Sequence, residues 1–291
     1  MSRCDKHAYL IMAHNQPSLL KKLLVLIDDE RNDIYIHIDK KMRNFKREEY
    51  ESVVKKSPIF WTERTDVKWG DYSQINCEML LLKEATRDEH QYYHLLSGVD
   101  LPLKKQDEIH EFFNEYNGLE FIGEDHPNIN EGILDRIKLY HILRDKKGTI
   151  GLYIKQINVS VQKLLKVNRL KGCQDIRFQK GRNWFSITHD LALYVIQKEN
   201  WIQKMFEWSQ CGDEMFLQTV ARNSKFSDKI CNTNTMTEIP DTRYIDWKRG
   251  EPYVFRNEDY VELKNAKALF ARKFDEKIDN QIIERLYTDL Q

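Results

Sequence analysis

Two short apolar runs separated by a helical pattern open the chain, and this order limits the available folds more than any other feature. The first run, Ala8–Ala13, ends at His14, and the second, residues 34–38, ends at Asp39. Between them, residues 17–27 begin with a proline suited to a first helical turn and carry leucines at helical spacing. A strand, a helix and a second strand in this order predict a parallel pair of strands joined by a crossover helix.

The same alternation continues through the first half of the chain. We expect, in this order, a helix over 73–86 with Ser73 as its N-cap, a strand over 92–98, a helix over 104–117 closed by Gly118, and a strand over 119–123. Such alternation predicts an α/β fold, in which helices flank a mainly parallel sheet. Ligands of such sheets bind beyond the carboxyl ends of the strands, where His14, Asp39 and the loop 97–102 lie.

The second half of the chain is less regular. Residues 126–180 carry many charges and few clear strand patterns. Beyond them we expect a strand over 183–188, a helix over 189–199, a loop leading into a helix over 212–222, a strand over 242–247, a helix over 257–267, a strand or loop over 268–274, and an amphipathic helix over 276–290. Internal repeats, low-complexity segments and Pro/Gly linkers are absent, so we predict one domain over 1–291.

Composition excludes several classes of protein. Lys and Arg total 46 and Asp and Glu total 46, so the net charge is zero and a nucleic-acid partner is not indicated. The apolar fraction of 41% supports a folded core. The five cysteines form no CxxC pair, which argues against a zinc site or a disulfide framework. Neither a signal-like stretch nor an apolar window of membrane-spanning length occurs, so we expect a soluble protein in a reducing compartment.

Several catalytic signatures are absent. The sequence has no GxGxxG after a strand, no P-loop, no GxSxG and no HExxH. It also has no Asp-x-Asp, the pair on which many nucleotide-sugar enzymes hold a divalent metal. The sequence therefore predicts no metal site and no cofactor.

Seven short blocks carry a resemblance to a known family. In order they are AYLIMAHN, IYIHIDKK, WGDYSQINCEMLLLKEA, YYHLLSGVDLPL, GRNWFSIT, CGDEMFLQT and ALFARKFD. From about Ala8 to Asp275 the chain resembles the core-2/I-branching β-1,6-N-acetylglucosaminyltransferase family, which also contains peptide O-xylosyltransferases. The resemblance implies a GT-A-like fold and inverting transfer from a UDP-sugar without the usual metal motif. It further implies a nucleotide-sugar-binding half over about 1–125 and an acceptor-binding and catalytic half over about 126–291.

The resemblance assigns the strand-end residues to the nucleotide. Asp39 looks like the residue that meets the nucleoside part of UDP, and His14 lines the same pocket. A carboxylate at a strand end can accept hydrogen bonds from ribose hydroxyls or from the uracil N–H. The alternative is local: Asp39 caps the next turn and His14 packs.

The resemblance also supplies a catalytic base. Glu214 stands where the family's base stands, directly after Asp213 at a predicted helix start. Transfer to a hydroxyl needs a base that accepts the hydroxyl proton, and one carboxylate suffices because the nucleotide diphosphate is already a good leaving group. The alternative is that both acidic residues complement the helix dipole, which we expect for Asp213.

Without a metal, fixed cations must stabilise the diphosphate. Lys273 matches the family's diphosphate contact, and its aromatic neighbours Phe270 and Phe274 are expected to bury its stem. The family's second cation is an arginine, and its strict match falls near Tyr253. Arg256 and Arg249 are both candidates for this role.

Acceptor sites for sugars combine aromatic platforms with polar groups. Trp247, Arg136 and Tyr140 lie where the family places acceptor contacts. Trp184 and Trp69 are expected to pack in the core, because a tryptophan buries a large area.

These expectations together describe a metal-independent, inverting transferase that moves N-acetylglucosamine from UDP to a glycan hydroxyl. A xylose, galactose or glucose donor and a non-catalytic glycan- or nucleotide-binding relative are the alternatives. Because the sequence shows no anchor, stem or paired cysteines, we expect a bacterial, cytoplasmic enzyme of cell-surface polysaccharide synthesis. Its acceptor is then expected to be lipid-linked, with loose membrane-surface contact through residues 143–180.

Overall fold

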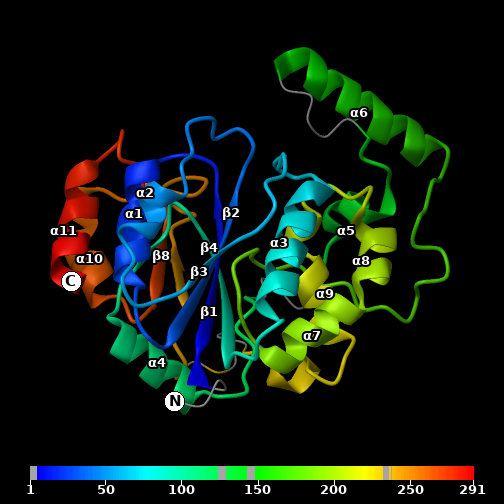
Figure 1. Ribbon diagram of the computed structural model, residues 1–291. Helices are drawn as coiled ribbons and strands as arrows, with labels where there is room; N and C mark the ends of the chain where they lie inside the picture. Colours follow the sequence, from blue (N-terminus) through cyan, green and yellow to red (C-terminus); the bar gives the residue numbers. More distant parts are fainter. Residues whose placement is uncertain (1–4, 124–128, 143–147, 232–235, 237) are drawn as a thin grey trace.

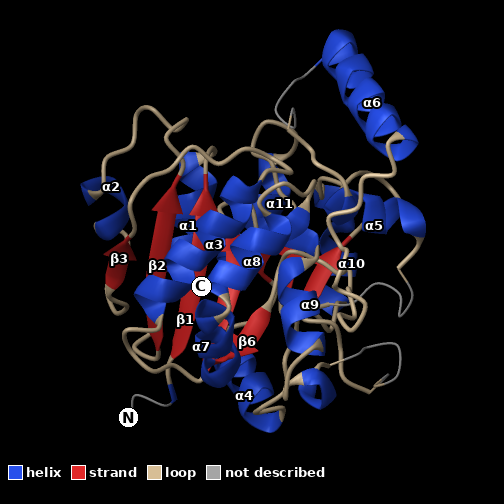
Figure 2. Ribbon diagram, turned by 90° about the vertical axis from the view of Figure 1, so that its right-hand side faces the viewer, coloured by secondary structure: helices blue, strands red, loops and turns tan. Residues whose placement is uncertain are grey.

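The computed structural model describes residues 5–123, 129–142, 148–231, 236 and 238–291 (Figure 1). Its larger sheet has five strands in the order β3-β2-β1-β4-β6. The strands are β1 (His7–Ala13), β2 (Asn32–Ile38), β3 (Ile59–Trp61), β4 (Tyr92–Ser97) and β6 (Ser186–Thr188). The first four run parallel and β6 is antiparallel to β4. The predicted α/β fold with a mainly parallel sheet flanked by helices is therefore confirmed (Figure 2).

The register of the central strands gathers their carboxyl ends at one edge. Ala13 of β1 pairs with Ile38 of β2, and Met12 pairs with Ser97 of β4. His14, Asp39 and the loop after Ser97 therefore follow neighbouring strands at the same edge of the sheet. In Figure 2 the arrowheads of β1 and β2 point to this edge.

Helices cover both faces of the sheet, and alternate strand residues face two separate cores. Tyr9 and Ile11 belong to the core with helices α1 (Pro17–Leu26) and α11 (Asn280–Leu290). Ala8 and Leu10 belong to the other core, formed with α3, α7, α8 and α9. These helices are α3 (Tyr72–Ala85), α7 (His189–Gln197), α8 (Glu199–Phe206) and α9 (Phe216–Arg222). A strand buried on both faces explains why its sequence is apolar throughout rather than alternating.

A smaller sheet carries the end of the chain. Its order is β5-β8-β7, from β5 (Leu101–Pro102), β8 (Phe270–Arg272) and β7 (Arg243–Ile245). Strands β7 and β8 are parallel, whereas β5 is antiparallel to β8. The remaining helices are α2 (Glu48–Glu51), α4 (Gln106–Glu115), α5 (Glu131–Lys138), α6 (Gly148–Leu164) and α10 (Tyr260–Asn265).

Several predicted elements differ from those observed. The N-cap of α3 is Asp71, whose side chain accepts from Ser73 N–H, so Ser73 is not the cap. The predicted strand 119–123 makes only isolated bridges among the described residues, from Glu120 to Ile230 and from Phe121 to Ser186 of β6. The predicted helix 189–199 is divided at Lys198 into α7 and α8. Each difference arises where side-chain and tertiary contacts outweigh a local pattern.

The charged region 126–180 contains two helices that the sequence pattern did not reveal. Helix α5 is short, and α6 stands apart from the rest of the molecule in Figures 1 and 2. None of the helices among the described residues is long and apolar enough to cross a membrane.

Candidate active site

The segment that carries Glu214 is a tight turn placed before α9. Cys211 adopts a left-handed conformation (φ 50°), and residues Gly212–Glu214 form one turn of 3-10 helix. The Glu214 carbonyl accepts from Gly181 N–H at 2.8 Å. A Cβ on Gly181 would lie 1.8 Å from the carbonyl oxygen of Gly123, so a larger residue is excluded there. The backbone of Glu214 is thus held by the loop at Gly181, which is distant in the sequence and passes very close to Gly123.

Two cations hold the Glu214 carboxylate. Arg136 Nη1 of α5 lies 2.8 Å from Oε2, and Lys180 Nζ lies 3.6 Å from the same oxygen. The side chain remains 31% exposed, and Oε1 makes no hydrogen bond within the described part of the chain. This geometry orients one oxygen and leaves the other available to a substrate hydroxyl. The structure therefore brings together the predicted base and the predicted acceptor residue Arg136, and adds Lys180, which the sequence did not indicate.

Two further carboxyl groups are buried behind Glu214. Asp213 accepts from Gln74 Nε2 of α3 at 2.9 Å, and it is 6% exposed. Burial, and then the nearby charge of Glu214, raise the pKa of Asp213 to about 7. Glu78 of α3 is fully buried, and burial followed by the charge of Asp213 raises its pKa well above the usual range. Asp213 is consequently tied to α3 and does not simply complement a helix dipole.

Asp39 is held by the turn that follows its own strand. Its Oδ1 accepts from Lys41 N–H at 2.7 Å and its Oδ2 accepts from Val67 N–H at 3.0 Å. The residue is 4% exposed. The bond from Lys41 is the local capping that the sequence left open as the alternative, whereas the bond from Val67 comes from the loop after β3. Two carboxylate oxygens offer about four acceptor sites, so two bonds from backbone N–H groups do not exhaust them.

His14 lies exposed beside this turn. Partial desolvation, followed by the charges of Lys41 and Arg272, lowers the pKa of His14, whereas Asp39 acts in the opposite direction. The four charged or titratable groups are therefore close enough to influence one another. Near neutral pH, His14 presents a neutral ring that can donate and accept hydrogen bonds.

One short loop joins the Asp39 turn to the catalytic segment. Val67 donates to Asp39, and three residues later the Gly70 carbonyl accepts from Cys211 N–H at 2.9 Å. Trp69, between them, is 78% exposed, so the expectation that it packs in the core is wrong. It lies in a loop at the surface, where no second layer covers it.

Arg272 is a cation that the sequence did not single out. Its Nη1 lies 2.7 Å from Asp100 Oδ1 and also donates to Ser97 Oγ. Its guanidinium stacks over the Trp184 ring at 4.3 Å from the centroid. Trp184 is half-buried and packs against the core, as expected, but its ring also positions this arginine. The only sequence signal for Arg272 was its position next to Lys273.

Lys273 follows Arg272 at the carboxyl end of β8. Its neighbours Phe270 and Phe274 are fully buried, and its own side chain is half-buried. The Lys273 ammonium forms no ion pair or hydrogen bond with any residue the structure describes. The Gln16 side chain connects this segment to the end of β1, since it donates to the Phe274 carbonyl and accepts from Glu276 N–H. Lys273 is thus held close to the strand-end edge with its charge uncommitted.

The two candidate arginines have different surroundings. Arg249 is surrounded by three carboxylates, Asp246, Asp259 (2.5 Å) and Glu262 (3.1 Å), and lies 4.3 Å from the centroid of the Tyr253 ring. Arg256, by contrast, is exposed and forms no ion pair within the described ranges. A guanidinium already neutralised by three acids is poorly suited to a diphosphate, so the structure favours Arg256.

The predicted acceptor residues do not form one cluster. Tyr140 follows α5, on the same segment as Arg136, and is 43% exposed. Its backbone is held by Gln162 of α6, and its ring lies under Arg169 at 5.1 Å. Trp247 is 57% exposed in the loop after β7 and makes no ring contact within the described ranges.

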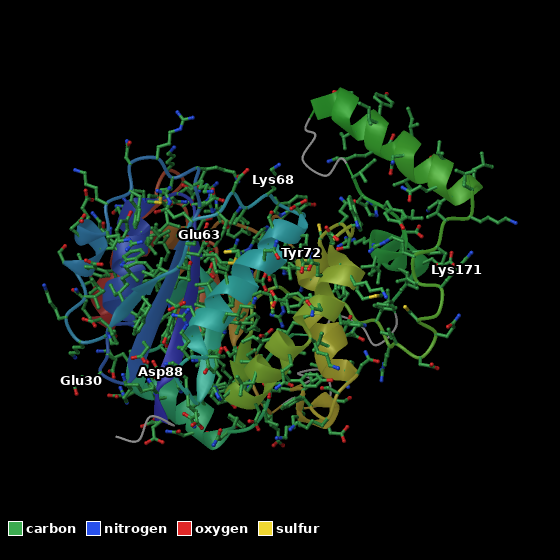
Figure 3. The ribbon with its side chains drawn as sticks, turned by 45° about the vertical axis from the view of Figure 1, so that its right-hand side comes forward. Glu30, Glu63, Lys68, Tyr72, Asp88 and Lys171 are labelled. Carbon is green, nitrogen blue, oxygen red and sulfur yellow. The ribbon has the colours of Figure 1, made fainter. Side chains whose placement is uncertain are left out.

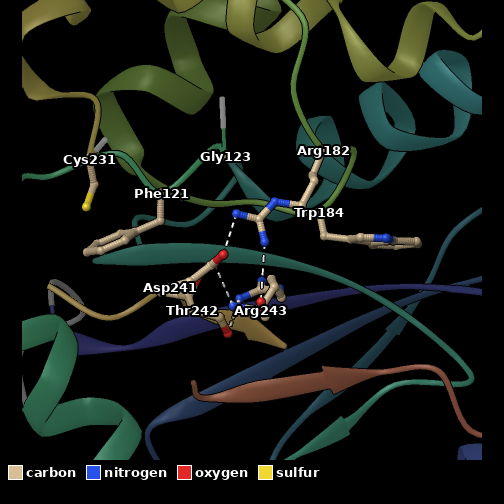
Figure 4. A pocket seen from close by; sticks show the side chains of 8 residues that line it. All are labelled: Phe121, Gly123, Arg182, Trp184, Cys231, Asp241, Thr242 and Arg243. Atoms are coloured by element: carbon tan, nitrogen blue, oxygen red, sulfur yellow. Dashed lines mark hydrogen bonds and ion pairs between the residues drawn. The ribbon is translucent and has the colours of Figure 1, made fainter. Parts of the chain in front are cut away.

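A small pocket lies between the two sheets (Figure 4). Its lining is Phe121, Gly123, Arg182, Trp184, Cys231, Asp241, Thr242 and Arg243. Two of these lining residues, Arg182 and Asp241, form an ion pair at 2.5 Å. Burial lowers the pKa of Arg243 to about 10. None of the predicted site residues lines this pocket. Within the described residues, no group of three or more His, Cys, Asp or Glu side chains is placed to hold a metal ion.

A family model described as Core-2/I-Branching enzyme matches residues 7–266, so the chain belongs to that family. Among curated proteins, xylosyltransferase sqv-6 of Caenorhabditis briggsae is 24% identical over 91% of this chain and 34% of that protein. Xylosyltransferase 2 of Rattus norvegicus is 22% identical over 96% of this chain and 33% of that protein. The chain thus spans about a third of the length of these relatives. Among solved structures, apo mouse xyloside xylosyltransferase 1 aligns with a TM-score of 0.39 and 9% identity over 91% of this chain and 96% of that one.

Proposed function

We propose that this chain is a glycosyltransferase that moves a sugar from a UDP-sugar to a glycan hydroxyl, with inversion at the anomeric carbon. The observation that carries the proposal is the Glu214 carboxylate, which is oriented by Arg136 and Lys180 and keeps Oε1 open. The loop 67–70 bonds to Asp39 at one end and to Cys211 at the other. It therefore connects the segment of the proposed base with the strand-end edge at which we place the donor. The mainly parallel sheet is compatible with the GT-A-like fold that the family resemblance implies.

In the proposed reaction, Glu214 accepts the proton of the acceptor hydroxyl while that oxygen bonds to the anomeric carbon. The bond from this carbon to the UDP oxygen breaks on the opposite face, so the configuration inverts. The diphosphate gains negative charge as it leaves. Lys273 and Arg256 stabilise that charge, since neither is neutralised by an ion pair among the described residues.

The remaining residues bind the substrates. Asp39 and His14 contact the nucleoside of UDP from the ends of β1 and β2. Arg136 contacts the acceptor while it orients Glu214. Tyr140 and Trp247 offer exposed aromatic faces on which a sugar ring can stack.

The donor has two candidates. N-acetylglucosamine is the donor sugar expected from the sequence. Xylose is the second candidate, because both curated relatives named above are xylosyltransferases. UDP-galactose and UDP-glucose remain the other donors to compare. We further propose that the acceptor belongs to a lipid-linked glycan of bacterial cell-surface polysaccharide synthesis in the cytoplasm.

The decisive experiment measures UDP release with each UDP-sugar, with and without EDTA. We expect one donor to be hydrolysed or transferred well above the others, with the same rate in EDTA. Binding of UDP-sugars without turnover of any of them would favour a non-catalytic relative. Loss of turnover in EDTA with recovery in Mn²⁺ would show that fixed cations do not suffice and that a carboxylate such as Asp39 or Asp100 binds a metal.

A further inference from the structure

Helix α6 carries an apolar stripe that nothing in the described structure covers. Its members are Tyr153, Ile154, Ile157, Val161 and Leu164 of α6 and Leu165 directly after the helix, with exposed fractions of 62, 40, 61, 47, 81 and 68%. They are spaced by one, three or four residues, so on a helix of 3.6 residues per turn they share one face. We call this set the α6 stripe. Six large apolar side chains exposed side by side indicate a contact surface rather than chance exposure.

The α6 stripe faces away from the body of the protein. The helix is attached through its opposite side, where Gln162 is buried and bonds both the N–H and the carbonyl of Tyr140. Lys163 forms an ion pair with Asp135 of α5 at 2.6 Å. In Figures 1 and 2, α6 stands beyond the edge at which the strands of the larger sheet end. The helix that carries the stripe therefore stands on the same side of the molecule as the candidate active site.

The charged side chains of α6 and of the residues that follow it, up to residue 174, are all basic. Residues 148–174 contain five basic residues and no Asp or Glu, although the whole chain has no net charge. The basic residues are Lys155, Lys163, Lys166, Arg169 and Lys171. Lys171 extends into solvent just beyond α6 (Figure 3). An apolar stripe on a helix with only positive charge complements an anionic surface that has an apolar interior.

We propose that α6 lies in the interface of an anionic lipid membrane, with the α6 stripe in the boundary between headgroups and acyl chains and the exposed Lys166 and Lys171, which follow the helix, at the phosphates. A second copy of the chain fits less well, because two such segments would bring the exposed, positively charged Lys166 and Lys171 against their own counterparts. The segment joins α5, which supplies Arg136 to Glu214. If the proposed sugar transfer holds, this docking would present the base to an acceptor carried on a lipid.

The test is co-sedimentation of the full chain with vesicles of phosphatidylcholine alone or mixed with phosphatidylglycerol. We expect binding to the mixed vesicles that weakens as salt is added. Ile157→Asn with Leu164→Asn should reduce this binding about tenfold or more, because two aliphatic side chains no longer enter the bilayer. Lys166→Gln and Lys171→Gln should each reduce it about fivefold and leave binding to neutral vesicles unchanged.

A matched control is Val261→Asn on α10, a helical residue that is 63% exposed and comparable to Ile157 at 61%. It should leave vesicle binding unchanged. Far-UV circular dichroism and the melting temperature verify that each variant folds. Absence of binding to the mixed vesicles overturns the proposal, as does self-association of the wild type that the α6 variants abolish. UDP release with a water-soluble acceptor is measured in parallel. Its absence in the wild type would contradict the proposed function but not the proposal that α6 binds a membrane.

Discussion

The two carboxylates of the candidate site are held in contrasting ways. Asp39 is nearly buried and both its oxygens accept from backbone N–H groups of nearby turns. Glu214 is half-exposed and is held by the side chains of Arg136 and Lys180, which come from other segments. The first is therefore part of the scaffold whether or not a ligand binds. The second has one oxygen with no structural partner among the described residues, as a base that must meet a substrate requires.

The comparison also separates the cations. Arg249 is neutralised by three carboxylates. Asp39 is likewise held within the protein, because its two oxygens accept hydrogen bonds from the N–H groups of Lys41 and Val67. Lys273 and Arg256 form no ion pair within the described ranges, and Glu214, although it is paired through Oε2, keeps Oε1 without a partner there. Arg249 therefore chiefly stabilises the fold, whereas Lys273 and Arg256 are available for chemistry. Asp39 stabilises its turn and still keeps acceptor sites beyond the two hydrogen bonds that hold it. The predictions below test this distinction, from the largest expected effect to the smallest.

Replacement of Glu214 by Gln should have the largest effect. The amide keeps the size and the oxygen that meets Arg136 but does not accept a proton, so kcat should fall ~10²–10⁴-fold. UDP release by the folded variant is the measurement. Glu111→Gln, an exposed residue of α4, is the control and should not change the rate. Wild-type kcat in the Glu214 variant would remove it from the role of base.

Lys273→Ala should lower turnover about a hundredfold or more, because a preorganised cation at the leaving group contributes ~3–4 kcal/mol to lowering the barrier. The same rates with and without EDTA are expected for the wild type. Lys277→Ala, on an exposed position just beyond, is the matched control. Equal rates for the two lysine variants would place the diphosphate elsewhere.

The two arginines should differ in kind. Arg256→Ala should reduce turnover and weaken donor binding by about tenfold, as expected for one charge-assisted hydrogen bond. Arg249→Ala should chiefly lower the melting temperature, because Asp246, Asp259 and Glu262 lose their shared partner. Steady-state kinetics and thermal melts of both variants distinguish a role in donor binding from a role in stability. The reverse pattern would show that Arg249 exchanges its acids for the diphosphate.

Asp39→Ala should raise the Kd for UDP roughly tenfold to a hundredfold, since one charge-assisted hydrogen bond contributes about 1.5–3 kcal/mol. It should also lower stability, because Lys41 and Val67 lose their acceptor. Calorimetry with UDP and with acceptor separates these effects, and acceptor binding should change less. A loss of stability with an unchanged Kd for UDP would make Asp39 a turn residue alone.

Glu78→Gln should affect stability in a pH-dependent way. The folded-state pKa of Glu78 is raised above its usual 4.5, so folding takes up a proton and wild-type stability falls as pH rises above 4.5. The variant lacks this loss, so its advantage should grow by at most about 1.4 kcal/mol per pH unit. Urea unfolding between about pH 5 and 8 measures it. Exposed Glu48→Gln should show no such trend, and a constant difference for Glu78→Gln would mean that its carboxyl is not kept neutral.

Much of the first half could be predicted because its signals are local. Strands β1 and β2 and helix α1 follow from apolar runs and leucine spacing, and polar residues after the two strands mark the edge of the sheet where the candidate site lies. The pairing of Arg136 with Glu214 could not be predicted in this way, because it depends on how α5 folds against the turn before α9. The exposed Trp69 was missed for the same reason: residue type indicates how much area can be buried, not what covers it.

By itself, the sequence determined the α/β class, the strand ends with His14 and Asp39, and the family blocks that single out Glu214 and Lys273. These features depend on residue type and short spacing, which the chain carries without folding. Only the tertiary structure decided which charges are satisfied and which are free, and that the α6 stripe faces outward. Burial and ion pairing are set by distances between remote segments, so helices with similar apolar spacing, such as α1 and α6, can end in opposite surroundings.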